Sequence, residues 1–383
     1  MMSPSGSAVS TRAIGRDGLP SAGRRRALRR VQAESPTKYL RIRLAGRLDA
    51  LDCMGGGEVQ LNSTQRVLQA AGADARLWQP WKEGFAEFDV LHLFGTRPEF
   101  VDVAQAARRH DVRVVLSPIT WYSLEAIWRE PRSLPRRLLG CARHILRKHW
   151  NAADSWRRRL YHACDLLLPN SQAEAAQLNE LFGIDAPRMH VVPNAAAAEM
   201  AAGNPEAFVA YSGCRDYVLY AGRIEPRKNQ LGFLRAMRGS PLPIVVLGDV
   251  VPGHERYYQE CRKVGGTNVH FVSAVPPASD LLASAYAGCR CLVLASWYET
   301  PGLVALEAGL QGVPLVLTKH GSATEYFGEL AEYVDPRHRR QLRRAVDRAY
   351  RGPRSRHRAQ HVRSNYTWSR VGEATLRAYE AIV

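Results

Sequence analysis

The stretch from Cys291 to Leu317 constrains the fold of this chain more than any other part of the sequence. It contains a short apolar run, a polar turn that carries Glu299, a segment with helical spacing that carries Glu307, and a second apolar run after Gly312 and Pro314. A strand, a helix and a second strand in this order are typical of a parallel α/β sheet. The stretch therefore predicts one βαβ unit of such a sheet.

The start of the helix in this unit indicates a ligand site. Thr300 is suited to the N-cap and Pro301 to the first helical position, where its missing N–H would have no partner. A helix that begins there points its free N–H groups at the carboxyl end of the preceding strand, where open parallel sheets bind ligands. Because Glu307 lies roughly 7.5 Å along the axis past Gly302, we expect Glu299 and Glu307 at different depths of one cleft, with an anion at the helix N-terminus.

The spacing of the two glutamates resembles a known family signature. Seven residues separate Glu299 from Glu307. This spacing resembles the E-x7-E signature of the retaining glycosyltransferases called group 1 or family 4, together with the residues that follow it, Ala308, Gly309, Gly312, Pro314 and Leu315. The resemblance extends over roughly residues 38–383 and is strongest from Tyr217 to Val334. It implies the GT-B fold, in which two doubly wound Rossmann-like domains face each other across a cleft and a C-terminal helix crosses back to the first domain.

The rest of the chain alternates strand-like and helix-like segments, as an α/β protein does. Predicted strands in the first part are Leu40–Leu44, Val90–Phe94, Val112–Leu116, Leu166–Leu168 and His190–Val192. Predicted strands in the second part are Tyr217–Tyr220, Ile244–Leu247, Val269–Val272, Cys291–Leu294 and Leu315–Leu317.

These segments suggest a domain plan. We expect a disordered basic tail (1–37), a Rossmann-like acceptor domain (38–200), an irregular linker (201–215), a Rossmann-like nucleotide-sugar donor domain (216–365) and a last helix (366–383) that packs on the first domain. The Arg-rich start is also compatible with a transit peptide or with translation from an upstream start, and the sequence leaves this open.

Two cations follow the first strand of the second domain. Arg223 is suited to bidentate phosphate contact and Lys228 to point-charge neutralisation. Both match the G-R…K segment of the resembled family, which grips the donor diphosphate. The resemblance thus implies catalytic roles for Glu299, Arg223 and Lys228, and donor contacts for Glu307, Gly302, Leu303, Pro301 and Gly222. Fixed cations and helix N–H groups would stabilise the leaving diphosphate, so we expect no metal and no other cofactor.

The sequence gives fewer signals for the residues that bind the acceptor. Gly56 and Gly57 lie in a predicted loop after the first strand, which is either a plain tight turn or, as the resemblance implies, a loop bordering the donor phosphates and the acceptor. Many family members carry a catalytic His after a central strand, but here the segment reads Ser117–Tyr122 without one. We expect His92 to be structural, expect Ser117–Tyr122 to line the cleft, and name no general base.

The charge of +17 is the unusual feature of the composition, and it implies an acidic partner. Basic side chains concentrate between Arg129 and Arg159, accompanied by Trp128, Trp150 and Trp156. Such a face fits an anionic membrane surface, a solvated helix surface or nucleic acid, although no zinc-finger or RNP-like motif accompanies the charge.

The cysteine pattern and the lengths of the apolar runs indicate in which cellular compartment the protein is expected. Seven scattered cysteines without a C-x-x-C pair indicate neither a disulfide framework nor a zinc site. No apolar run approaches the ~18 residues of a spanning helix. We therefore expect a cytoplasmic protein that is at most peripheral on the inner face of a membrane.

The predicted function is retaining transfer of a sugar from a UDP- or GDP-sugar to a glycan or lipid-linked acceptor, in cell-surface polysaccharide or glycolipid synthesis. Two alternatives remain open. One is a sugar-nucleotide binding protein without transfer activity or a GT-B epimerase, and the other is a basic nucleic-acid-binding protein.

Overall fold

The structure is a computed structural model that describes residues 40–47, 55–129, 134–150, 155–300 and 302–383. The predicted basic tail and Pro301 lie outside these ranges. None of the described helices is both long and apolar enough to cross a membrane.

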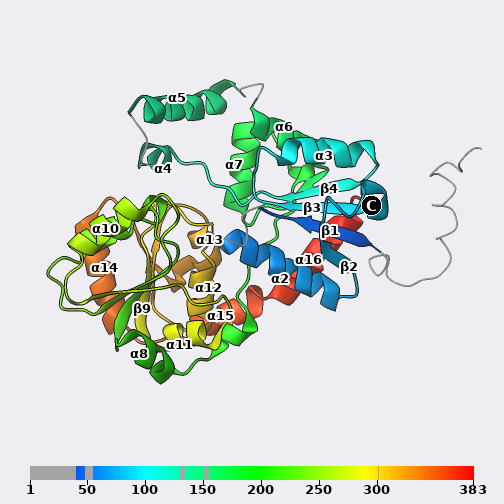
Figure 1. Ribbon diagram of the computed structural model, residues 1–383. Helices are drawn as coiled ribbons and strands as arrows, with labels where there is room; N and C mark the ends of the chain where they lie inside the picture. The colour runs from blue at the N-terminus through cyan, green and yellow to red at the C-terminus, as the bar shows by residue number, and fades with distance from the viewer. Residues whose placement is uncertain (1–39, 48–54, 130–133, 151–154, 301) are drawn as a thin grey trace, which may run out of the picture. The chain divides into compact units, whose positions relative to one another are not determined.

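Two separate parallel sheets organise the described residues (Figure 1). The first sheet has the strand order β2-β1-β3-β4-β5, and every neighbouring pair is parallel. Its chain order reverses between β1 and β3, which makes this the switch point of the sheet. Its strands are β1 (Arg41–Ala45), β2 (Asp74–Leu77), β3 (Val90–Phe94), β4 (Arg113–Ser117) and β5 (Leu166–Leu167).

The second sheet has the order β11-β10-β9-β6-β7-β8, again with all pairs parallel. Its switch point lies between β6 and β9. The carboxyl ends of these two central strands are therefore the expected position for a ligand. The strands are β6 (Tyr217–Ala221), β7 (Ile244–Leu247), β8 (Val269–Val272), β9 (Cys289–Leu294), β10 (Leu315–Thr318) and β11 (Glu332–Val334).

Helices connect the strands of both sheets. Those that precede or follow first-sheet strands are α2 (Gly56–Ala70), η2 (Phe85–Glu87), α3 (Phe100–Arg109), α4 (Leu124–Arg129), α5 (Leu134–Trp150), α6 (Trp156–Ala163), α7 (Gln172–Phe182) and η3 (Ala186–Arg188). Those around the second sheet are η4 (Ala198–Ala201), α8 (Pro205–Ser212), η5 (Pro226–Lys228), α9 (Gln230–Ala236), α10 (Glu255–Val264), α11 (Asp280–Gly288), α12 (Leu303–Leu310), α13 (Ala323–Phe327), η6 (Gly328–Leu330), α14 (Arg339–Arg351) and α15 (Arg356–Asn365). We call the described residues from β1 to the segment after η3 (40–197) the first-sheet half and those from η4 to α15 (198–365) the second-sheet half.

The central strands of both sheets are buried on both faces, which is why they are continuous apolar runs rather than alternating ones. All five residues of β3, for example, are buried. In the second sheet, Leu219 and Leu292 belong to one core cluster, whereas Val218 and Val293 belong to the other. Successive residues of a strand thus point into opposite core layers.

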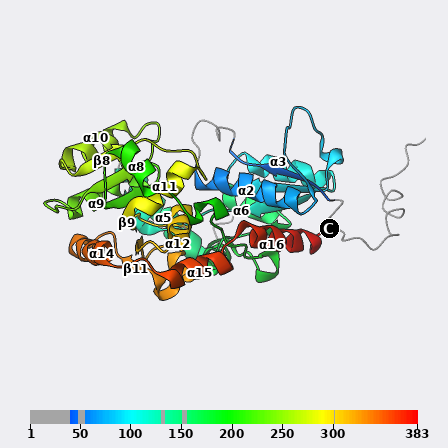
Figure 2. The same cartoon turned by 90° about the horizontal axis from the view of Figure 1, so that it is seen from below.

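The last helix, α16 (Trp368–Glu380), returns to the first-sheet half, as predicted. Val371, Ala378 and Tyr379 lie in the same core cluster as Ile42 of β1. Figures 1 and 2 show α16 beside α2, and the two helices are in contact. The crossing C-terminal helix is therefore confirmed.

Three expectations about secondary structure were wrong. The short strands β2 and β11 were missed because each has a single buried residue, Ala75 in β2 and Val334 in β11, and so lacks a clear apolar run. Residues His190–Val192 do not form a strand, although Met189 makes a single parallel bridge to Leu167.

The stretch 201–215 is not irregular, as we had expected of a linker. It contains α8, whose N-cap Asn204 accepts a hydrogen bond from the Glu206 amide through its side chain. Phe208 is fully buried in a core cluster of the second-sheet half. A helix of only 8 residues with one buried position gives little periodicity to recognise.

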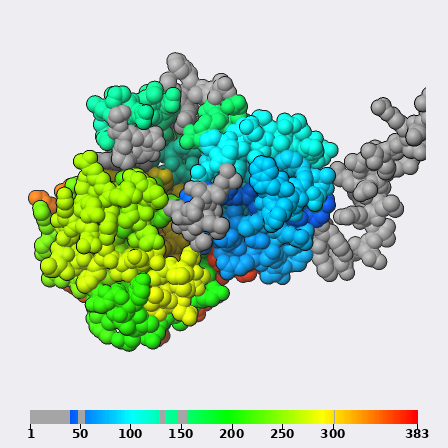
Figure 3. Space-filling view, viewed as in Figure 1, coloured from blue at the N-terminus to red at the C-terminus, as the bar shows by residue number. Residues whose placement is uncertain are grey.

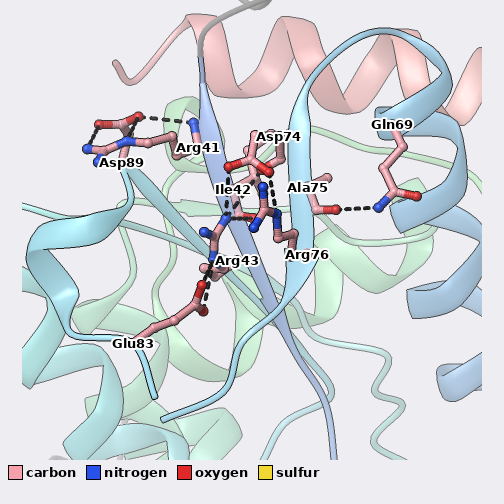
Figure 4. A network of polar contacts seen from close by, with 9 residues as sticks. All are labelled: Arg41, Ile42, Arg43, Gln69, Asp74, Ala75, Arg76, Glu83 and Asp89. Atoms are coloured by element: carbon pink, nitrogen blue, oxygen red, sulfur yellow. Dashed lines mark hydrogen bonds and ion pairs between the residues drawn. The ribbon is translucent and has the colours of Figure 1, made fainter. Parts of the chain in front are cut away.

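An ion-pair network holds the outer strands of the first sheet together (Figure 4). The buried Arg43 side chain on β1 donates through Nε to both carboxylate oxygens of Glu83, at 3.0 Å each. Its Nη1 donates to the carbonyl oxygen of Ile42. Nearby, Arg41 contacts the Asp89 carboxylate through Nε and Nη2, at 3.2 and 2.9 Å. These contacts satisfy charges that would otherwise be costly to bury.

Candidate active site

The candidate site lies at the switch point of the second sheet. The segment after β6 carries Gly222, Arg223 and Lys228, and the segment after β9 carries Glu299. Because β6 and β9 are parallel neighbours, both segments emerge at the same edge of the sheet. Residues that are about 70 positions apart in the sequence are thereby brought together.

A cavity of about 710 Å³ opens at this edge, and both halves of the molecule line it. Figure 3 shows a hollow between the blue-to-cyan atoms of the first-sheet half and the green-to-yellow atoms of the second-sheet half. Of the predicted site residues, all that the structure describes line this cavity, namely Glu299, Arg223, Lys228, Glu307, Gly302, Leu303, Gly222, Gly56 and Gly57. Pro301 lies outside the described residues.

The central contact of the site is an ion pair between Lys228 and Glu299. Lys228 Nζ donates to Glu299 Oε1 at 2.6 Å, and the Ser296 hydroxyl donates to the same oxygen at 2.5 Å. The side chains are only 12% and 5% exposed. A buried pair of this kind is held in one geometry by its surroundings rather than by the attraction alone.

The surroundings keep the Glu299 carboxylate charged. Burial by itself would raise the pKa of Glu299, but Lys228 and Arg227 outweigh it and hold the pKa below its ordinary value. Burial lowers the pKa of the Lys228 ammonium, and the Glu299 carboxylate opposes that effect. The site therefore presents a fixed, desolvated pair of opposite charges to the cavity.

A second cation group lies beside this pair. Arg227 donates to Glu225 Oε1 through Nε and Nη2, at 3.2 and 2.9 Å, and its guanidinium lies over the Tyr298 ring. Arg223 Nη2 lies 3.5 Å from the same Glu225 oxygen. The three cations that line the cavity are thus organised around two carboxylates, those of Glu225 and Glu299. Such an arrangement holds the positive charges in place before a ligand binds.

Two glycines set the backbone of this site where a side chain would not fit. Gly321 has φ +112°, and a Cβ there would lie 1.9 Å from the Glu299 carbonyl oxygen. Gly248 has φ +152°, and a Cβ there would lie 2.2 Å from the Gly222 carbonyl oxygen. Only glycine permits these close approaches. They hold the loops that carry Glu299 and Gly222 against their neighbours.

Helix α12 begins later than predicted. Its first residue is Leu303 and its N-cap is Gly302, with φ +85°, so the N-cap at Thr300 was wrong. A Cβ on Gly302 would lie 3.1 Å from Leu294 Cδ1 and 3.5 Å from Glu299 Oε2. The chain needs a glycine to turn this close to Glu299. The helix N-terminus nevertheless opens into the cavity, since Gly302 and Leu303 line it.

Glu307 occupies a different electrostatic environment from Glu299. Its Oε2 accepts a hydrogen bond from the Tyr286 hydroxyl at 2.6 Å. Burial raises the pKa of Glu307, and the Tyr286 hydrogen bond opposes this without reversing it. One end of the cavity therefore has a carboxylate fixed by cations, whereas another has a carboxyl group held by a phenol.

Glycines at the start of α2, in the first-sheet half, lie close to Arg223 of the second-sheet half. A Cβ on Gly55 would lie 3.1 Å from Arg223 Nη1, and one on Gly56 would lie 3.7 Å from Leu303 Cδ1. Gly56 and Gly57 form the first turn of α2 rather than the loop that we predicted. The helix starts this early because Glu58 Oε2 accepts a hydrogen bond from the Gly55 amide at 2.8 Å.

Two further residues of the first-sheet half line the cavity with unusual features. Ile119 has φ +47°, a costly conformation for a β-branched residue. The next amide, that of Thr120, donates to the buried Glu174 carboxylate at 2.7 Å, and burial raises the pKa of Glu174 to about 7. Asn194 is 4% exposed, and its Oδ1 has no hydrogen-bond partner in the described part of the chain.

His92 lies away from the cavity. Its Nδ1 is 2.7 Å from the Tyr379 hydroxyl and its Nε2 is 3.0 Å from the Ser117 hydroxyl. Burial lowers the pKa of His92 to about 3, so the ring is neutral near pH 7. The contacts tie β3 and β4 to α16, in agreement with a structural role. In the predicted cleft segment Ser117–Tyr122, Ile119 is the residue that lines the cavity.

Within the described ranges, no group of three His, Cys, Asp or Glu side chains is placed to hold a metal ion. The prediction of metal-independent chemistry has not been tested and stays a prediction. Three cations and two helix N-termini, those of α2 and α12, contribute positive charge to the cavity. These groups suit a ligand with two phosphates, flanked by hydroxyl groups that the carboxylates can bind.

Two family models match this chain, and each matches a different half. The model described as "Glycosyltransferase Family 4" matches residues 54–199, and the model described as "Glycosyl transferases group 1" matches residues 212–362. The chain belongs to the group 1 glycosyltransferases. The resemblance seen in the E-x7-E spacing is thereby confirmed, and the protein is an enzyme of the hexosyltransferase type, EC 2.4.

Individual relatives of this glycosyltransferase are distant. The "D-inositol 3-phosphate glycosyltransferase" of Pseudarthrobacter chlorophenolicus is 26% identical over 324 residues, which cover 77% of this chain and 76% of the relative. The sucrose-phosphate synthase of Thermosynechococcus elongatus superposes with a TM-score of 0.68 at 17% identity, over 89% and 98% of the two chains. Anabaena HepE, solved in complex with UDP and glucose, gives 0.65 at 15% identity over 90% and 100%. These solved structures confirm the GT-B fold of the glycosyltransferase.

Some residues of the glycosyltransferase site escaped the sequence analysis. Arg227 stands in the same cationic run as Lys228, and its position beside Arg223 could have been a signal. The sequence analysis gave Asn194 no role. Tyr286, Ser296 and Ile119 carry no local signal, because their contribution depends on tertiary contacts.

Proposed function

We propose that this glycosyltransferase moves a sugar from a nucleoside diphosphate sugar to a glycan or lipid-linked acceptor, with retention of the anomeric configuration. The observation that carries the proposal is the buried Lys228–Glu299 pair, which lines a cavity shared by two helix N-termini and by Glu307. No metal ion is part of the proposal.

The leaving diphosphate would bind among the cations. Breaking the sugar–phosphate bond increases negative charge on the diphosphate, and positive groups fixed beforehand stabilise that charge most effectively. Arg223 and Lys228 line the cavity with Arg227, and the α12 N-terminus adds its free N–H groups. A single well-placed donor of this type accounts for about 10²–10³ in rate in other enzymes.

The two glutamates would divide the recognition of the donor. Glu299, held charged beside Lys228, would bind the transferred sugar and support the positive character of its anomeric carbon. Glu307, which lines the same cavity beside Tyr286, would accept hydrogen bonds from the ribose hydroxyls. Retention is usually discussed for this family as front-face attack in which the leaving phosphate helps to deprotonate the acceptor. Such a reaction needs no second carboxylate of the type used by retaining hydrolases.

The acceptor would enter from the first-sheet half. The glycines at the start of α2 leave backbone N–H groups accessible beside Arg223, and Ile119 narrows the cavity next to Gly57. The Oδ1 of Asn194 is a buried acceptor that has no hydrogen-bond partner among the described residues, and such groups are usually satisfied by a ligand or by water. We assign it to a hydroxyl group of the bound acceptor or donor sugar.

A second acceptor class comes from the comparisons. The Pseudarthrobacter relative is named for D-inositol 3-phosphate, a small phosphorylated polyol. A free sugar or polyol phosphate would add an anion to a cavity that already holds three cations. We favour a lipid-linked or glycan acceptor at the cytoplasmic face of a membrane, in surface polysaccharide or glycolipid synthesis, and treat the small phosphate as the competing candidate.

Donor identity is the first property to test. Thermal unfolding in the presence of UDP, GDP and their sugars should show a raised melting temperature with one nucleoside diphosphate and its sugar. Because Anabaena HepE was solved with UDP and glucose, UDP-sugars should be tested first.

Radiolabelled donor then separates the acceptor classes by where the label goes. Transfer to a lipid extract or a glycan supports the favoured acceptor, and transfer to a polyol phosphate supports the competing one. Binding of the donor without transfer to any acceptor would favour a binding protein, and conversion of the sugar on the nucleotide would favour an epimerase. Stabilisation by nucleic acid but by no nucleotide sugar would contradict the proposal entirely.

A further inference from the structure

Exposed apolar side chains are concentrated on two adjacent helices, α4 and α5. Ten large hydrophobic side chains are exposed in the described part of the chain, and six of them lie on this pair of helices. They are Leu124, Trp128, Leu134, Leu138, Leu139 and Ile145. Scattered exposed apolar residues are normal in a globular protein, but a concentration of this kind marks an interaction surface. We call the exposed side chains of α4 and α5 the α4–α5 surface.

The apolar side chains of α5 form a stripe on one side of the helix. At about 100° per residue, Leu134, Leu138 and Ile145 project within roughly 40° of one another, with Leu139 farther around. These four side chains are 48–57% exposed. The packed side is a different one, because a Cβ on Gly140 would lie 2.7 Å from Ile127 Cγ2 of α4. The helix therefore turns its leucines away from the protein instead of into a core.

The same helix carries only positive charge. The segment from Leu134 to Trp150 contains no Asp or Glu, and Arg136 and Arg143 are exposed. On the helical wheel these two arginines lie about 40–60° beyond Leu139 and about 140–180° from Leu134, Leu138 and Ile145. Apolar side chains on one side of a helix and arginines on the other are the pattern of helices that lie in the plane of an anionic bilayer surface.

The α4–α5 surface also adjoins the candidate active site. Helix α4 contacts η5, the short helix that carries Arg227 and Lys228. Figure 1 shows α5 standing clear of both sheets, with α4 below it on the side of the second sheet. A partner bound to this surface would therefore sit close to the cations of the cavity.

We propose that the α4–α5 surface binds an anionic lipid bilayer, with the leucines and Trp128 entering the boundary of the headgroups and the arginines contacting lipid phosphates. A second copy of the chain fits less well, because pairing the same surface would oppose arginine with arginine. Attachment of this kind would hold the cavity at the membrane. The proposal does not depend on the proposed sugar transfer, since it concerns binding to lipid and not turnover.

The test is flotation of the full chain with vesicles. Vesicles that contain phosphatidylglycerol should carry the protein at low salt and release it at high salt, whereas pure phosphatidylcholine vesicles should not carry it. The double substitution Arg136→Glu/Arg143→Glu should lower the partition into phosphatidylglycerol vesicles at least about tenfold. Leu138→Glu/Ile145→Glu should do the same, because it places charge in the apolar stripe.

Matched controls separate this surface from the general positive charge of the chain. Arg340→Glu/Arg344→Glu makes the same change in net charge on two exposed arginines of α14. Tyr211→Glu places a carboxylate at an exposed apolar position on α8. Both controls should bind vesicles within about threefold of the wild type, since neither touches the α4–α5 surface. Thermal unfolding of each variant checks that it is folded.

Three results would overturn the proposal. One is a wild-type chain that does not float with phosphatidylglycerol vesicles at low salt. Another is an equal loss of binding in the α14 control, which would assign the binding to net charge. The third is a dimer in sedimentation experiments that Leu138→Glu/Ile145→Glu converts to monomer without changing flotation, because the surface would then belong to a second copy.

Discussion

Two largely buried ion pairs, one in each half of the molecule, each join a basic side chain to a glutamate, but their surroundings differ. In the first-sheet half, Arg43 pairs with Glu83, with side chains that are 5% and 18% exposed (Figure 4). In the second-sheet half, Lys228 pairs with Glu299, at 12% and 5%. Burial and opposite charge are thus common to both pairs and do not distinguish a catalytic site from a structural one.

The difference lies in what else the charges contact. Arg43 Nη1 also donates to the carbonyl oxygens of Ile42 on β1 and Asp74 on β2, and Arg43 does not line the cavity. Lys228 and Glu299 line the cavity at the switch point of the second sheet. We therefore expect damage to the first pair to change stability alone, and damage to the second pair to change the reaction.

The largest effect should come from Glu299→Gln. The substitution keeps the shape and the hydrogen bonds from Lys228 and Ser296 but removes the charge. We expect kcat to fall about 10²–10³-fold, as for loss of one electrostatic stabiliser of a transition state. Steady-state transfer of labelled sugar measures this, with nucleotide binding checked separately by thermal shift. A kcat within about threefold of the wild type would place the chemistry elsewhere.

The next effect should be that of Arg43→Leu, and it should be an effect on stability. Removing the cation leaves Glu83 with an uncompensated buried charge, which costs about 3–5 kcal/mol in the free energy of unfolding. Denaturant unfolding measures this change. The kcat of the folded fraction should stay within about twofold of the wild type, and a selective loss of kcat would break the distinction between the two pairs.

A smaller effect is expected from Glu307→Gln. If Glu307 binds the ribose, the loss of charge-assisted hydrogen bonds should raise KM for the donor about tenfold, or ~1.4 kcal/mol, with kcat little changed. Tyr286→Phe removes the hydrogen bond to Glu307 and serves as a milder companion. A fall in kcat with unchanged KM would assign Glu307 to the chemical step instead.

The smallest predicted effect concerns pH. The pKa of Glu299 is held below its ordinary value of 4.5, so the pair contributes stability that is present above pH 4.5 and is lost as the pH falls through the lowered pKa. The free energy of unfolding of Glu299→Gln should therefore fall less steeply than that of the wild type as the pH drops below 4.5. Denaturant unfolding between neutral and acid pH measures this, and parallel curves for the two proteins would contradict it.

The second-sheet half was the more predictable of the two. Its central strands are buried on both faces and so are continuous apolar runs, and β7 and β8 were predicted with the bounds that the structure has. The strand and turn signals around Glu299 placed the cations and glutamates at one edge of a parallel sheet. What was missed there, β11 and α8, is short and has few buried positions.

The first-sheet half was harder to interpret because its site residues act through tertiary contacts. The role of Ile119 depends on a backbone conformation, and that of Asn194 on a buried amide oxygen that no group in the described part of the chain contacts by a hydrogen bond. Neither property has a sequence signature. The exposed stripe on α5 is a third example, since its leucines have ordinary helical spacing and only the structure shows that they face outward.

The most direct test of the central claim is a single-turnover measurement on Lys228→Gln and Arg43→Leu with saturating donor and acceptor. If the Lys228–Glu299 cavity is where the sugar–phosphate bond breaks, Lys228→Gln should slow the chemical step at least about 10²-fold, while folded Arg43→Leu turns over at the wild-type rate. Equal rates for Lys228→Gln and the wild type would contradict the claim.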